Sequence, residues 1–157
     1  MDISQAVASV RYKMGDVVYT REVFASFPDK AIVVHITASQ PGKLDFTAKL
    51  KCPHKDSTVS ALGEAALVLH GQLPQPASVL SFEARLLISA EGGTLKASDA
   101  GVEIRGATSA TLKLVAASSY KDFQDVSGDP AARCEKTAAA PLLSRSQGPT
   151  RAATVTR

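Results

Sequence analysis

The stretch from Val17 to Ala38 constrains the fold of this chain more than any other part of the sequence. Residues 17–27 and 31–38 are both rich in β-branched and aromatic side chains, which favours two β-strands. Between them, Phe27-Pro28-Asp29-Lys30 has proline at the second position of a turn, where its fixed φ suits type I geometry. Apolar side chains point to both faces of each predicted strand. Such strands belong in the middle of a sheet covered on both sides, so we expect residues 17–38 to be interior.

The alternating pattern continues along the chain and predicts about eight to ten strands. Residues 5–14, 44–51 and 80–89 alternate apolar and polar side chains, as expected where one face is buried and the other is solvated. A polar connection is predicted at 52–58, and shorter strands follow at 65–70, 94–97, 101–105 and 110–117. Turn residues at regular spacing favour a sandwich or a barrel.

The chain changes character after residue 127. Asp129 and Pro130 supply a capping residue and a first-turn proline ahead of good helix formers, so a helix is predicted from about Pro130 to Ala140. Residues after Pro141 lack periodicity and apolar mass, which predicts disorder. The fold class is therefore all-β, an antiparallel β-sandwich with one short C-terminal helix and a disordered tail. We predict a β-sandwich over residues 1–118, a linker with the helix over 119–140, and the tail over 141–157.

The net charge of +3 does not indicate a nucleic-acid binder, because the excess lies in the tail. Residues 131–157 hold five of the 18 basic residues and one of the 15 acids, which leaves 13 basic and 14 acidic residues in 1–130. No apolar run approaches the roughly 18 residues of a membrane span, and the first residues lack the pattern of a signal peptide. We predict a soluble protein with no nucleic-acid or membrane partner and leave its localisation open.

Two cysteines, Cys52 and Cys134, lie far apart without CxxC or Cys/His spacing. We expect two free thiols, with a disulfide as the alternative, and no zinc site. Gly92-Gly93 lacks the strand–turn–helix context of a phosphate-binding loop. We therefore predict no cofactor and no metal.

Residues that could carry catalysis are few, and each has a simpler structural explanation. No G-x-S-x-G motif is present, and the three histidines are too scattered for an H-E-x-x-H ligand set. His35 lies in a predicted buried strand, where a hydrogen-bonded structural role is expected, whereas His54 and His70 are expected to be solvated. Glycoside hydrolysis needs a pair of carboxylates. The candidates by residue type are Glu22, Asp45, Glu83, Glu91 and Glu103, each on the polar face of a strand or in a turn. We predict no catalytic or cofactor-binding residue in this chain.

Several segments resemble one known family in the same order along the chain. The most specific is Tyr19-Thr20-Arg21-Glu22-Val23-Phe24-Ala25-Ser26, followed by Pro28-Asp29-Lys30-Ala31. Residues 2–6, 10–12, 82–85, 91–93, 107–112, 117–120 and 128–130 add weaker matches. Together they resemble the N-terminal β-sandwich domain of glycoside hydrolase family 95, the inverting α-L-fucosidases, over roughly residues 2–140.

The resemblance implies a supporting rather than a catalytic role. In that family the sandwich begins earlier, and an (α/α)6 barrel with the catalytic carboxylates and asparagines follows the linker helix. This chain ends at Arg157. We therefore expect a piece of a longer enzyme, truncated at both ends and inactive alone, whose parent could be secreted or periplasmic. An out-of-frame origin of the tail is left open. The predicted function is the non-catalytic sandwich of a fucosidase whose substrate is a fucosylated glycan.

Other functions stay open at this point. An autonomous carbohydrate-binding sandwich is the main alternative, and a small esterase with a Ser/His pair is a third, without motif support. An incomplete sandwich would expose sheet edges and apolar faces, which are templates for pairing. We therefore also predict self-association through an exposed edge or face, most simply as a dimer.

Overall fold

The computed structural model describes residues 6–74 and 79–141 and contains ten strands and one helix there. The elements are β1 (Ala8–Met14), β2 (Val17–Ser26), β3 (Ala31–Ala38), β4 (Leu44–Ala48), β5 (Ser57–Ala61), β6 (Ala66–Pro74), β7 (Val79–Glu91), β8 (Thr94–Ser98), β9 (Gly101–Ala107), β10 (Ser109–Ser118) and α1 (Pro130–Ala139). None of the described helical residues forms a span long and apolar enough to cross a membrane. Of the tail predicted over residues 141–157, residues 142–157 lie outside the described part.

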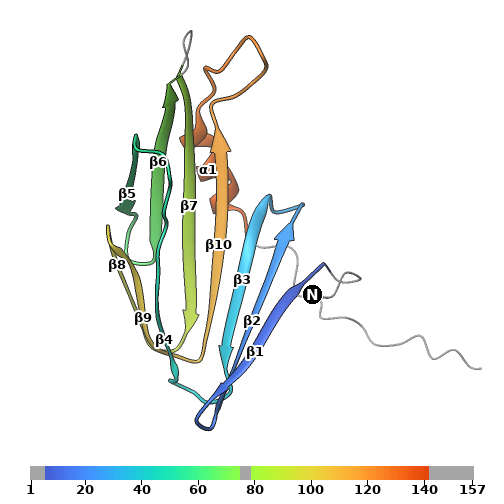
Figure 1. Cartoon of the computed structure of the whole chain (residues 1–157), viewed down its shortest axis with the longest axis vertical. Helices are drawn as coiled ribbons and strands as arrows, with labels where there is room; N and C mark the ends of the chain where they lie inside the picture. The colour runs from blue at the N-terminus through green and yellow to red at the C-terminus, as the bar shows by residue number, and fades with distance from the viewer. Residues whose placement is uncertain (1–5, 75–78, 142–157) are drawn as a thin grey trace, which may run out of the picture.

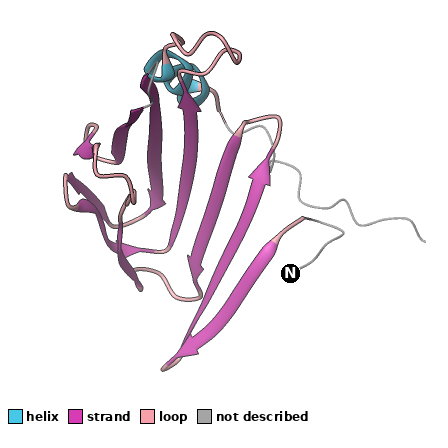
Figure 2. Ribbon diagram, turned by 45° about the horizontal axis from the view of Figure 1, so that its top comes forward, coloured by secondary structure: helices cyan, strands magenta, loops and turns pink. Residues whose placement is uncertain are grey.

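The strands form two unequal antiparallel sheets that pack as a sandwich (Figures 1 and 2). The large sheet has the order β1-β2-β3-β10-β7-β6-β5, and the small sheet has the order β4-β9-β8. Helix α1 lies behind the large sheet in Figure 1, on the face opposite the small sheet. The predicted class, an antiparallel β-sandwich with one short helix, is confirmed.

The main core lies between the two sheets. Leu67 of β6 and Val102 and Ile104 of β9 are completely buried in it. Side chains alternate along each strand, so even-numbered residues of β7 and β10 face this core and odd-numbered residues face the helix side. We call the face of the large sheet that carries Leu86, Ile88 and Ala110 the inner face, and the opposite one the outer face.

Residues 17–38 form β2 and β3 as predicted, joined by a turn in which the Lys30 amide donates to the Phe27 carbonyl at 3.2 Å. The expectation that both strands are covered on both sides is wrong for β2. Within β2 only Ser26 is buried, because β2 is second from the sheet edge and the main core reaches it only as partly buried Val17 and Tyr19. Strand β3 is interior to the sheet, and its Ala31, Val33 and Ile36 are buried.

Helix α1 follows its sequence signals closely. The Asp129 carboxylate accepts a hydrogen bond from the Ala132 amide at 3.0 Å, and Pro130 occupies the first turn. Cys134 is the buried residue of the helix and packs with Ala31 and Val115 in a second, smaller core on the outer face. This contact fixes α1 against β7 and β10.

Strand boundaries differ from the predictions mainly around residues 52–74. Strand β5 lies partly inside the stretch predicted as a polar connection, because its alternation is carried by Ser57, Val59 and Ala61, which have little apolar area. Strand β6 extends to Pro74, beyond its predicted end at residue 70, because the long strand β7 pairs with it throughout. Strand β4 ends at Ala48, three residues before its predicted end.

Candidate functional site

A buried cluster of charged residues lies on the outer face beneath α1. Glu83 of β7 has a fully buried side chain, and Nε of Arg85 donates to its Oε1 at 2.5 Å. Residues two apart on a strand share a face, which brings these two side chains together. His70 is the direct cross-strand partner of Glu83, and its Nδ1 lies 3.1 Å from Oε2. Within the described structure that oxygen accepts no hydrogen bond, so His70 is its neighbour and not its hydrogen-bond donor.

The same cluster holds the helix. Nη2 of Arg85 donates to the Ala131 carbonyl at 3.3 Å, and Sγ of Cys134 donates to the backbone carbonyl of Glu83 at 3.3 Å. Burial, and secondarily the negative charge of Glu83, raises the pKa of the Cys134 thiol above its ordinary value. Because it is enclosed by α1, Glu83 is placed to stabilise the fold rather than to protonate a substrate.

The other end of α1 is held by a buried lysine. Lys113 projects from β10 on the outer face, and its Nζ donates to the carbonyls of Thr137 at 2.9 Å and Ala140 at 2.6 Å. A cation at this position meets the unpaired carbonyls and the negative end of the helix dipole. Arg133 ties the start of the helix to the preceding loop, donating to the carbonyls of Ser118 and Tyr120.

The remaining carboxylate candidates are engaged within their own sheets. Glu91 accepts from the Ser109 hydroxyl at 3.2 Å. On the small sheet, Asp45 accepts from the Gly106 amide at 2.7 Å, and Glu103 pairs with Arg105.

The three carboxylates of the large sheet stand too far apart to act as a pair. Glu22 on β2 and Glu91 on β7 are separated by three strand spacings, about 14 Å. Glu83 and Glu91 are eight residues apart along β7, or about 27 Å. Both separations exceed the roughly 5–9.5 Å between the two carboxyl groups of glycosidases.

The histidines are placed separately. His35 Nδ1 lies 2.9 Å from the Thr111 hydroxyl, in keeping with the predicted structural role. The His54 ring contacts the edge of the Phe82 ring, with 5.9 Å between centroids. Among the described residues no group of three or more His, Cys, Asp or Glu side chains could hold a metal ion. Cys52 and Cys134 are both free thiols.

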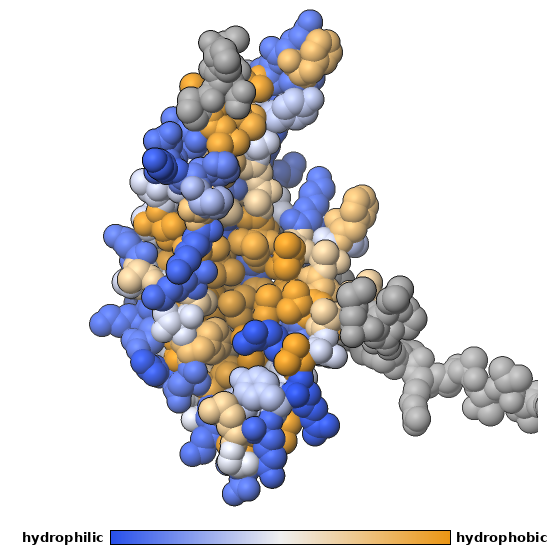
Figure 3. All heavy atoms as spheres, in the orientation of Figure 1, coloured by the Kyte–Doolittle hydropathy of each residue, from blue (hydrophilic) through white to orange (hydrophobic). Residues whose placement is uncertain are grey.

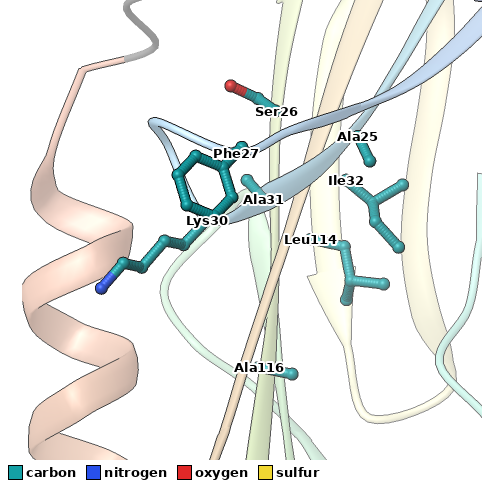
Figure 4. Close-up of a pocket in the computed structure, with 8 residues that line it drawn as sticks. All are labelled: Ala25, Ser26, Phe27, Lys30, Ala31, Ile32, Leu114 and Ala116. Atoms are coloured by element: carbon teal, nitrogen blue, oxygen red, sulfur yellow. The ribbon is translucent and has the colours of Figure 1, made fainter. Parts of the chain in front are cut away.

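Two adjoining grooves open on the inner face. One, of about 450 Å³, is lined by Ala25, Ile32, Leu114 and Ala116 together with the turn that carries Phe27. Figure 4 shows Ile32 and Leu114 pointing to the same side of the sheet, whereas Lys30 points away from them. The second groove, of about 590 Å³, shares Leu114 and Ala116 and continues to β6 and β7. Their apolar lining suits a packing partner better than a sugar.

Comparison with known families assigns the domain. The family model described as "Glycosyl hydrolase family 65, N-terminal domain" matches residues 1–123. The chain belongs to this family. A stretch of 46 residues is also 50% identical to Alpha-L-fucosidase 2 of Arabidopsis thaliana and covers 29% of this chain but 6% of that relative. The prediction of a glycoside hydrolase N-terminal β-sandwich domain is confirmed.

In this family 65 N-terminal domain, sequence reasoning misplaced the Glu83 cluster. Alternation put Glu83 and Arg85 on a solvated face, but α1 covers Glu83. His70 is exposed as predicted, although β6 continues past it to Pro74. The available signal was Cys134, the one apolar side chain larger than alanine after Pro130 in the predicted helix, which marks the face that packs. Without knowledge of which face received the helix, that signal could not identify Glu83.

Proposed function

We propose that this domain is the non-catalytic sandwich of a family 95 α-L-fucosidase, which supports a separate catalytic (α/α)6 barrel. The match of 46 residues at 50% identity to Alpha-L-fucosidase 2 carries this proposal, since it connects a glycosyl hydrolase N-terminal domain to that activity. The substrate of the whole enzyme would then be a fucosylated glycan.

The placement of the acids supports a non-catalytic role. Glu83 is enclosed and ion-paired, whereas Glu103 is exposed and ion-paired to Arg105 on the small sheet. A general acid and a base must flank one glycosidic bond, and neither of these acids faces a pocket of sugar size together with a second carboxylate. The docked helix supports a scaffold role, because Lys113 and Arg85 fix its direction as the chain leaves the sandwich.

The test is turnover of an aryl α-L-fucoside by the purified protein, with a complete family 95 fucosidase as the positive control. We expect no release of the aryl group by this chain. The catalytic barrel of that fucosidase, prepared without its own sandwich, should bind this chain in a pull-down and become more heat-stable. Turnover that persists through purification and disappears in Glu22→Gln or Glu91→Gln would contradict the proposal. A catalytic barrel that neither binds this chain nor becomes more heat-stable in its presence would also contradict it.

A second candidate is an autonomous carbohydrate-binding module, favoured by the polar outer face beyond α1. Strand register aligns Glu22, His35, Thr111 and Ser89 in one row across the sheet, and Thr20, Thr37, Ser109 and Glu91 in the next. Hydroxyl and carboxylate groups of this kind hydrogen-bond sugars. Calorimetric titration with fucosylated oligosaccharides distinguishes the two roles. Saturable binding that Thr111→Val weakens would favour the module, and no binding would favour the scaffold.

A further inference from the structure

The two layers of the sandwich do not match in width. Seven strands form one layer and three form the other. Strand β8 packs over β5 and β6, and β9 packs over β6 and β7. The order β4-β9-β8 therefore puts β4 at the edge nearest β10, and the inner face of β3, β2 and β1 extends beyond it (Figure 2).

The burial of side chains along β3 and β10 shows where the small sheet stops covering the inner face. On the inner face of β3, Ala38 and Ile36 are buried, Val34 is half-buried, and Ile32 is 46% exposed. On β10, Ala110 is buried, whereas Ala116, six residues further on, is exposed. The uncovered part is thus continuous with the covered core and differs from it in that no strand among residues 6–74 and 79–141 forms a second layer over it.

We call this uncovered part the open face. Strand register assigns to it Ala8, Val10, Tyr12, Met14, Val23, Ala25, Ile32, Val34, Leu112, Leu114 and Ala116. Val10 and Met14 are 56% and 63% exposed on edge strand β1. In Figure 3 apolar residues gather in the middle of the molecule, between the small sheet and the β2–β3 side. Arg21 is the charged residue in register with this set, and its long side chain can reach the rim.

The size of the open face fits an association surface. Four strands about 4.8 Å apart and about 20 Å long present roughly 400 Å² of floor. Contiguous apolar patches above a few hundred Å² are rare on monomeric soluble proteins. Two such floors give about 800 Å² before side-chain relief is counted, which is below the roughly 1,200 Å² of standard specific interfaces and corresponds to a weak, reversible association.

We infer that the open face packs against the open face of a second copy of this chain about a two-fold axis. The strands β1, β2 and β3 of each copy then occupy the vacant part of the other copy's second layer, with β1 beside the free edge of β4. Packed sheets lie about 10 Å apart, so a three-stranded portion of one copy has the thickness that the small sheet already has. A symmetric pairing also closes, which limits assembly to a dimer.

The test is sedimentation velocity of the full chain at several concentrations. We expect a reversible dimer of twice 16.4 kDa, with a dissociation constant on the order of micromolar, because the interface is small. Ile32→Lys puts a charge at the centre of the open face and should weaken the dimer at least tenfold. Leu62→Lys is the matched control, because Leu62 is 43% exposed in the β5–β6 turn, and it should leave the dimer unchanged.

Each outcome of this experiment either supports or overturns the proposed dimer. A wild-type protein that stays monomeric at every concentration overturns the inference, as does an open-ended ladder of larger species. A dimer that survives Ile32→Lys, or that Leu62→Lys disrupts equally, places the interface elsewhere and also overturns it. Circular dichroism confirms that the variants are folded. If Ile32→Lys does not fold, Val10→Lys on β1 replaces it, with the same loss of dimer expected.

Discussion

Replacing Glu83 by glutamine should destabilise the domain by about 3 kcal/mol. The carboxylate is fully buried, and Arg85, its partner at 2.5 Å, is 15% exposed. Removing one member of a buried ion pair leaves the other charge uncompensated and typically costs about 3–5 kcal/mol. We take the lower end, because Arg85 keeps some access to water and the glutamine amide oxygen can still accept its hydrogen bond.

The measurement is urea unfolding followed by circular dichroism at neutral pH. With a urea dependence of roughly 2 kcal/mol per molar, the midpoint should fall by about 1.5 M. The double variant Glu83→Gln/Arg85→Met should lose clearly less than the sum of the two single variants, since replacing both charges removes the uncompensated one.

The small sheet provides a matched control. Glu103 and Arg105 are also two residues apart on one strand, but both are exposed. Glu103→Gln should therefore change stability by no more than about 0.5 kcal/mol. If Glu83→Gln shifted the urea midpoint as little as Glu103→Gln does, burial would not determine how much the Glu83–Arg85 pair contributes to stability, and the prediction would be refuted.

Three further predictions follow from the helix and its preceding loop. Cys134 should be alkylated by iodoacetamide more slowly than Cys52 in the folded protein, because burial raises the pKa of its thiol, and urea should remove the difference; equal native rates would contradict this. Lys113→Met should speed hydrogen exchange of the α1 amides at least tenfold relative to those of β9, because the helix C-terminus loses its cation. Hydrogen bonds from the Ser127 hydroxyl and the Ser127 backbone amide, followed by Lys121, lower the pKa of Asp125 from 3.8 to about 2. The contacts of the Asp125 carboxylate with Ser127 and Lys121 should therefore be complete above pH 3.8 and be lost as the pH falls through about 2. An NMR titration of the Ser127 amide with a midpoint near pH 4 would refute this.

The alternation of β7 shows how a correct local rule can give a wrong environment. Period-2 alternation placed Leu86 and Ile88 in the core, where they are buried. The same rule placed Glu83 on the other face, which is also correct. The error lay in equating that face with solvent, because α1 arrives there from about 50 residues further along the chain. Charged strand residues are therefore poor guides to exposure when a helix of unknown position remains to be placed.

What the sequence determined by itself is local. Alternating side chains set the strands, the Pro28 turn joined β2 to β3, and Asp129 and Pro130 began α1, because each depends on backbone preferences within a few residues. The tertiary structure alone decided what lies over each face. It put β2 near an edge, left Ile32 half-exposed, and enclosed Glu83 beneath α1. Burial is set by contacts between residues that are distant in the chain, and a local sequence pattern does not predict which distant element packs on a given face.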